Sequence, residues 1–79
     1  MANTQAAIND ICKQRGLPHV PKGAPCEVDG KRGVIWGGNH SANFNVKFDD
    51  SGRIGNCHPG WRMKIMTPEG EILHESNDA

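Results

Sequence analysis

The first periodic segment of the chain predicts a short amphipathic helix. Over residues 4–15 the apolar side chains recur at the i, i+3 and i+4 spacing of one helix face. Asn3 or Thr4 is a suitable N-cap, and Gly16 is a suitable C-terminal stop. A helix this short is unstable alone, so its apolar stripe must pack on the rest of the domain. The stripe consists of Ala7, Ile8, Ile11 and Cys12.

After a connector rich in proline and glycine, the apolar period changes from about 3.6 residues to about 2, which predicts β-strands. The dipeptide Asp29-Gly30 is a strong signal for a two-residue hairpin turn. In the segment 43–48, phenylalanine and valine alternate with Asn43, Asn45 and Lys47, which we therefore expect to be exposed. The predicted strands are residues 26–28, 31–36, 43–48, 53–57, 61–66 and 71–74.

Short strands joined by hairpin turns predict a mainly β fold. We expect a small SH3-like antiparallel barrel of about five to six strands, preceded by one N-terminal α-helix. The segment 58–61, His-Pro-Gly-Trp, suits the single 3₁₀ turn between the last two barrel strands of that architecture. The predicted segments are the N-terminal helix (1–16), a Pro/Gly connector (17–25), the barrel (26–74) and a frayed acidic tail (75–79).

Composition favours one small domain and argues against a membrane protein. The chain has 79 residues, of which 35% are hydrophobic, and it contains ten glycines and five prolines. No segment approaches the ~18–20 apolar residues that a membrane-spanning helix needs, and the N-terminus lacks the pattern of a secretion signal. We therefore expect a single cytoplasmic domain with no membrane partner.

The overall neutrality of the chain conceals an uneven distribution of charge. Residues 13–64 contain all nine basic residues but only four of the nine acids, which gives this part a net charge of +5. Four of the other five acids lie beyond Thr67. A basic body favours an anionic partner, and the acidic end of the chain is a candidate competitor for the same surface. Ordinary solvated charge is the alternative interpretation.

Two segments resemble known proteins. Residues 23–35, Gly-Ala-Pro-Cys-Glu-Val-Asp-Gly-Lys-Arg-Gly-Val-Ile, are similar to the opening of KOW/Tudor-type SH3-like barrels. Residues 33–35 and 43–48, together with the sequence Asn-Cys-His-Pro-Gly-Trp at 56–61, resemble short uncharacterised proteins encoded by bacteriophages and prophages. The second resemblance implies a phage origin and a bacterial host cell, but it implies no activity.

The cysteines and histidines do not have the spacing of a metal site or a catalytic site. Three cysteines at wide spacing argue against a disulfide scaffold, so we expect reduced, buried thiols. No pair has the short spacing of a zinc knuckle, and Cys57 with His40 or His58 as base lacks a third orienting group. We therefore expect no metal, no cofactor and no enzymatic activity. The ligand candidates considered are Cys12, His19, Cys26, His40, Cys57 and His58.

The function that remains is the recognition of a macromolecular partner through the protein surface. The first hypothesis is a protein-interaction or accessory factor that acts on a host or phage complex. The alternative is a nucleic-acid-binding module whose basic residues form one strip on the barrel. The sequence leaves open the identity of the partner, the oligomeric state, and whether each tryptophan is core or exposed. The candidate binding residues are Lys31, Arg32, Trp36, Asn39, His40, Asn43, Lys47, Arg53, His58, Trp61, Arg62 and Lys64.

The expected independence from metal can be tested by chelation. Dialysis against EDTA should leave the circular dichroism spectrum and the thermal midpoint unchanged. A structural zinc would supply much of the folding free energy of so small a chain. Unfolding on chelation would instead identify cysteines and histidines as ligands.

Overall fold

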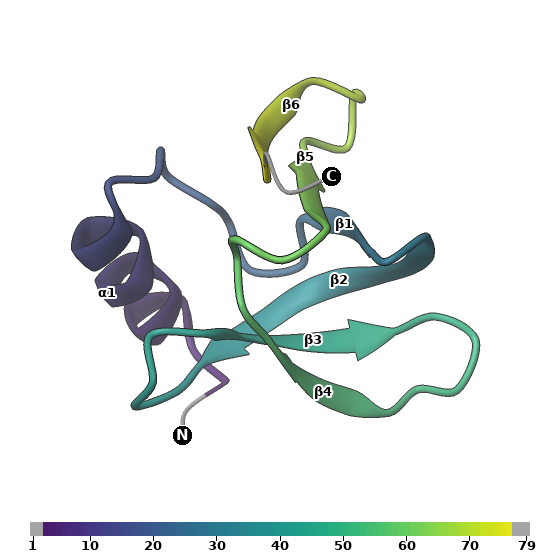
Figure 1. The fold of residues 1–79 in the computed structure, drawn as a ribbon, viewed down its shortest axis with the longest axis horizontal. Helices are drawn as coiled ribbons and strands as arrows, with labels where there is room; N and C mark the ends of the chain where they lie inside the picture. Colours follow the sequence, from purple (N-terminus) through teal and green to yellow (C-terminus); the bar gives the residue numbers. More distant parts are fainter. Residues whose placement is uncertain (1–2, 77–79) are drawn as a thin grey trace.

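The computed structural model describes residues 3–76 and shows a mainly β fold with one N-terminal helix (Figure 1). The strands form one six-stranded antiparallel sheet, and the molecule measures 25 × 24 × 24 Å. The predicted fold class, a small antiparallel barrel-like β domain behind a helix, is confirmed. The elements are α1 (Gln5–Arg15), β1 (Pro25–Val28), β2 (Lys31–Gly38), β3 (Phe44–Phe48), β4 (Ile54–Cys57), β5 (Met63–Met66) and β6 (Ile72–Glu75).

Helix α1 begins and ends where the sequence predicts. The Thr4 hydroxyl accepts a hydrogen bond from the Ala7 N–H (3.1 Å), which caps the N-terminus. Gly16 adopts the left-handed conformation (φ 68°) and ends the helix. The predicted stripe supplies the buried side chains of the helix, which are Ile8, Ile11 and Cys12.

The strand order is β4-β3-β2-β1-β5-β6. Strands β1 to β4 follow one another as a meander, and β5 then returns to pair with β1, so that the sheet bends around its core. The β1–β2 hairpin turns at Asp29 and Gly30, both with positive φ (52° and 81°), which matches the right-handed twist of the strands. Within the described residues, β4 and β6 are the two terminal strands.

A glycine allows α1 to approach β2 closely. A side chain at Gly38 would collide with Ile11 and would lie 2.9 Å from the carbonyl oxygen of Ala7. The sequence pattern predicts that this strand ends at Trp36, whereas β2 continues to Gly38 through a register shift between Ile35 and Gly37. Both glycines therefore belong to β2, where they pair with β3, and Gly38 leaves the space that the helix occupies.

The segment before β5 is a turn and not part of the strand. The Trp61 N–H donates to the His58 carbonyl (3.0 Å), which closes a hydrogen-bonded turn at the place where the sequence predicts a single turn. Arg62 has a positive φ (46°), so β5 begins only at Met63. The predicted strand 61–66 is therefore two residues too long at its start.

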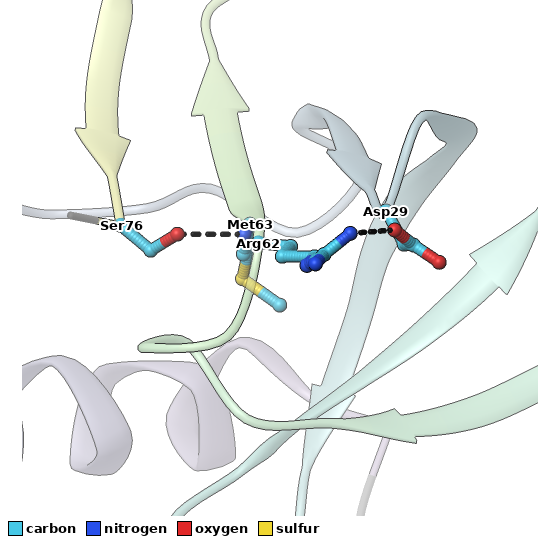
Figure 2. Close-up of polar contacts among 4 residues, drawn as sticks. All are labelled: Asp29, Arg62, Met63 and Ser76. Atoms are coloured by element: carbon cyan, nitrogen blue, oxygen red, sulfur yellow. Dashed lines mark hydrogen bonds and ion pairs between the residues drawn. The ribbon is translucent and has the colours of Figure 1, made fainter. Parts of the chain in front are cut away.

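The start of the predicted acidic tail is bonded to the sheet. Glu75 lies in β6, and the Ser76 N–H donates to the Met63 carbonyl (2.8 Å). The Met63 N–H in turn donates to the Ser76 hydroxyl (3.1 Å), as Figure 2 shows. The rest of the predicted tail, residues 77–79, lies outside the described residues.

A buried charge on the helix should unfold the domain. Ile11 is 1% exposed, so Ile11→Asp should lower the free energy of unfolding by about 3 kcal/mol or more. Asn9→Asp places the same carboxylate at an exposed position of α1 and should change it by no more than about 0.5 kcal/mol. Urea denaturation followed by circular dichroism measures both. Equal stability of the two variants would show that α1 does not pack on the sheet.

Candidate functional site

The side of β2, β3 and β4 opposite the core carries an aromatic, basic and amide-rich surface, which we call the outer face. The register places Val34, Lys47 and Ile54 beside one another on β2, β3 and β4. Asn45 and Asn56 form the next same-sided pair across β3 and β4. The outer face comprises Val34, Trp36, Asn45, Lys47, Ile54 and Asn56.

Trp36 is a surface residue held by two lysines. The Nζ of Lys22 lies 4.3 Å from the ring centroid, and the Nζ of Lys47 lies 4.9 Å from it. Lys22 Nζ also donates to the Asn3 carbonyl (2.8 Å), which fixes the connector beside the ring. Cation–π contacts of this kind contribute about 0.5–1 kcal/mol each at exposed sites. The arrangement therefore holds two positive charges at defined positions next to a half-buried aromatic ring.

Asparagine side chains link the outer face to the neighbouring loop. The Asn39 amide nitrogen donates to Asn45 Oδ1 (3.2 Å) and to Asn56 Oδ1 (2.7 Å). The Asn45 amide nitrogen donates to Asn3 Oδ1 (3.1 Å). Asn45 is only 1% exposed, so the prediction that it is exposed is wrong. It lies across from the exposed Asn56, but the N-terminal segment and the β2–β3 loop cover it.

The β2–β3 loop is anchored to the helix. The Nε of Arg15 donates to the Ala42 carbonyl (2.6 Å), and its guanidinium also donates to Asn43 Oδ1 (3.2 Å). Inside the loop, Asn39 Oδ1 accepts from the backbone N–H of Ser41 (3.0 Å). Asn39 and Asn43, both predicted to bind a partner, therefore shape the loop itself.

Two shallow grooves meet on β4. The first has a volume of about 420 Å³ and lies between the β2–β3 loop and β4, with His40 on its wall. The second has a volume of about 570 Å³ and is lined by Lys31, Asp50 and Arg53 among others. Both grooves include Ile54, which is 47% exposed. An exposed isoleucine between polar walls is a suitable contact for an apolar side chain.

The structure does not bring the predicted basic residues together in one strip. Arg32, Glu27, Lys64 and Glu75 are successive neighbours across β2, β1, β5 and β6, so their charges alternate in sign. Lys64 is separated from Lys47 by two intervening strands.

Arg62 also lies next to an acid. It forms an ion pair with Asp29 (2.9 Å; Figure 2), and its guanidinium lies 5.7 Å from the ring centroid of Trp61. Trp61 is 50% exposed, so neither tryptophan is a fully buried core residue. His58 is exposed and accepts from the Gly60 N–H (2.9 Å). His58, Trp61 and Arg62 belong to the β4–β5 connection and not to the outer face.

The three cysteines are buried, as expected for small core residues. Burial, with Cys57, Asp49 and Glu27 nearby, raises the pKa of Cys26 to about 12. Burial also raises the pKa of Cys12 and of Cys57. A thiol with a raised pKa stays protonated at neutral pH, which makes it a weak nucleophile and a poor metal ligand.

Two further features bear on the sequence-based expectations. Among residues 3–76, no three His, Cys, Asp or Glu side chains lie close enough together to hold a metal ion. The expectation of a metal-free protein stays a prediction. In the same part of the chain, no helix has both the length and the hydropathy to cross a bilayer.

Several residues on or beside the outer face were not predicted as binding residues, namely Lys22, Val34, Ile54 and Asn56. Lys22 lies in a proline-rich connector whose path has no periodic pattern, so nothing in the sequence placed it at Trp36. Ile54 and Asn56 lie two residues apart in a predicted strand, and this spacing was a usable signal that they share a face. The burial of Asn45 had no signal, because it depends on distant segments.

The amide network should contribute to stability through its buried member. Asn45→Leu should lower the free energy of unfolding by about 1–3 kcal/mol, because the part-buried bonds to Asn39 and Asn3 are lost. Asn56→Leu, at an exposed position, should change it by no more than about 0.5 kcal/mol. Urea denaturation of both variants tests this. Similar losses would mean that the Asn45 bonds are not specially protected from water.

Comparisons with known proteins do not assign a function to the outer face. A scan against protein-family models, a search of curated proteins and a search of solved structures each found no match. The residues and geometry of the chain itself are therefore the basis for inferring its function.

Proposed function

We propose that the protein is a non-enzymatic binding module of phage or prophage origin, which acts as a protein-interaction or accessory factor in a bacterial host cell. Its site is the outer face of β2, β3 and β4. The observation that carries this proposal is Trp36, whose ring is contacted by Lys22 and Lys47, with the exposed Ile54 next to Lys47 on the neighbouring strand. Tryptophan is enriched at protein interfaces, and the two lysines add positive charge that an acidic group of a partner can meet.

The charge pattern favours a protein over a nucleic acid as partner. A nucleic-acid backbone needs a run of cations that neutralises successive phosphates. Here Arg32 and Lys64 alternate with Glu27 and Glu75 across the sheet, and Arg62 is paired with Asp29. The cations that remain on the outer face are few and lie around one aromatic ring, which suits a local acidic group.

The buried thiols support a non-enzymatic role. The cysteines have raised pKa values, so they are poorly suited to nucleophilic catalysis. The grooves that meet at Ile54 lie on the outside of the sheet, where they are suited to contact with another macromolecule.

Neutralising one lysine of the outer face tests whether this face, and not another part of the surface, binds the partner. Tagged protein is first used to capture a partner from bacterial lysate treated with nuclease, and the identified partner is then titrated by calorimetry. Lys47→Gln should weaken binding by at least about fivefold, because it removes a cation from the proposed interface. Lys64→Gln removes the same charge two strands beyond β2 and should leave the affinity within about twofold.

Three results would contradict the proposal. Capture that disappears on nuclease treatment would identify a nucleic acid as the partner. An affinity that falls steeply with salt concentration would point the same way. Equal losses for Lys47→Gln and Lys64→Gln would place the site elsewhere.

A further inference from the structure

The free edge of β4 presents backbone groups that no other strand uses. The Phe48 N–H donates to the Arg53 carbonyl (2.9 Å), so these two residues form a hydrogen-bonded pair. Bonded and non-bonded pairs alternate along an antiparallel ladder, which places the N–H and C=O of Ile54 and Asn56 away from β3. Within residues 3–76, no strand pairs with that side of β4. In Figure 1, β4 lies at the border of the sheet.

This edge lacks two of the features that usually prevent strands from pairing with other chains, namely charged side chains and proline. Strand β4, Ile-Gly-Asn-Cys, contains no charged residue and no proline. The other terminal strand, β6, carries Glu75, and its His74 Nε2 lies 2.7 Å from the Pro59 carbonyl oxygen, at hydrogen-bonding distance. Of the two terminal strands, β4 is therefore the one open to an added strand.

The side chains around β4 indicate what kind of segment fits. Ile54 and Asn56 are exposed on the outer face, on the same side as Lys47. Lys31 and Arg53 line the groove at the beginning of β4, where Asp50 is the acid among the lining residues. The surroundings of the edge are thus apolar at Ile54, mainly cationic at the beginning of β4, and rich in amide groups around Asn56.

We propose that β4 accepts an extended acidic peptide segment of the partner protein as an added antiparallel or parallel strand. Its backbone bonds to Ile54 and Asn56, an apolar side chain packs on Ile54, and a carboxylate lies near Lys47 or Arg53. Strand addition of this kind takes affinity from backbone hydrogen bonds and specificity from alternate side chains. The inference rests on the proposed function and names the partner class of the same surface.

A displayed library of random peptides, selected on the intact protein, provides the probe. The expected peptides alternate apolar and acidic residues. Asn56→Pro removes an outward N–H and should lower the affinity for the selected peptide by at least about tenfold. Proline is tolerated on a strand edge where its nitrogen faces outward. Asn56→Ala keeps the N–H and should lose less affinity than the proline variant.

A proline on the other terminal strand is the matched control. The Ser76 N–H donates to Met63, so alternation places the N–H of Glu75 on the free side of β6. Glu75→Pro therefore makes the same backbone change and should bind the peptide as the unmodified protein does. Amide hydrogen exchange on the unmodified protein gives a second measurement that needs no variant. The peptide should protect the amides of Ile54 and Asn56 and leave Gly55, already bonded to β3, unchanged.

The outcomes separate this inference from the proposed function. If Asn56→Pro binds the peptide normally while Lys47→Gln does not, strand addition is wrong and the outer face remains the site. Absence of selected peptides, with concentration-dependent self-association that Asn56→Pro abolishes, would make a second copy of the chain the occupant and would overturn the inference. Displacement of the peptide by a single-stranded oligonucleotide would overturn both. If Asn56→Pro does not fold, hydrogen exchange on the unmodified protein is the test. Protection of the Ile54 and Asn56 amides by the peptide supports strand addition, and unchanged exchange overturns it.

Discussion

The close contact between α1 and the end of β2 is the constraint on which the rest of the structure depends. Gly38 has no side chain, so Ile11 and the backbone at Ala7 can approach the strand. The helix then brings Arg15 to the β2–β3 loop, which it holds by hydrogen bonds. The fixed loop positions Asn39, whose amide joins β3 to β4. One packing contact thus fixes the wall of the groove on the outer face.

The electrostatics of the surface follow from strand order. Residues that are far apart in the sequence become neighbours across β2, β1, β5 and β6, and their charges alternate. Opposite charges on neighbouring strands attract, whereas like charges directly opposite one another destabilise a sheet. The row of charged residues from β2 to β6 is therefore nearly neutral. On the outer face, by contrast, Lys22 and Lys47 lie against the ring of Trp36.

The two terminal strands of the sheet, β4 and β6, differ in their charge and in their hydrogen bonding. Strand β6 is bonded at its end through Ser76 and carries an acid, whereas β4 has an uncharged edge with Lys31 and Arg53 near its beginning. The proposed site, the amide network and the free edge all lie on or beside β4. A single strand therefore combines an apolar contact, fixed polar groups and unpaired backbone donors and acceptors, which a partner segment needs together.

The sequence by itself determined the elements whose signals are local. The N-cap and glycine stop of α1, the Asp29-Gly30 hairpin and the alternation around Phe44 and Val46 depend on neighbouring residues, so the helix, the strands and most of the core were predictable. Tertiary structure alone decided which strands are neighbours and what covers each face. It separated Lys47 from Lys64, buried Asn45, and placed Lys22 at Trp36. These outcomes depend on contacts between distant segments, which a pattern of nearby residues does not record.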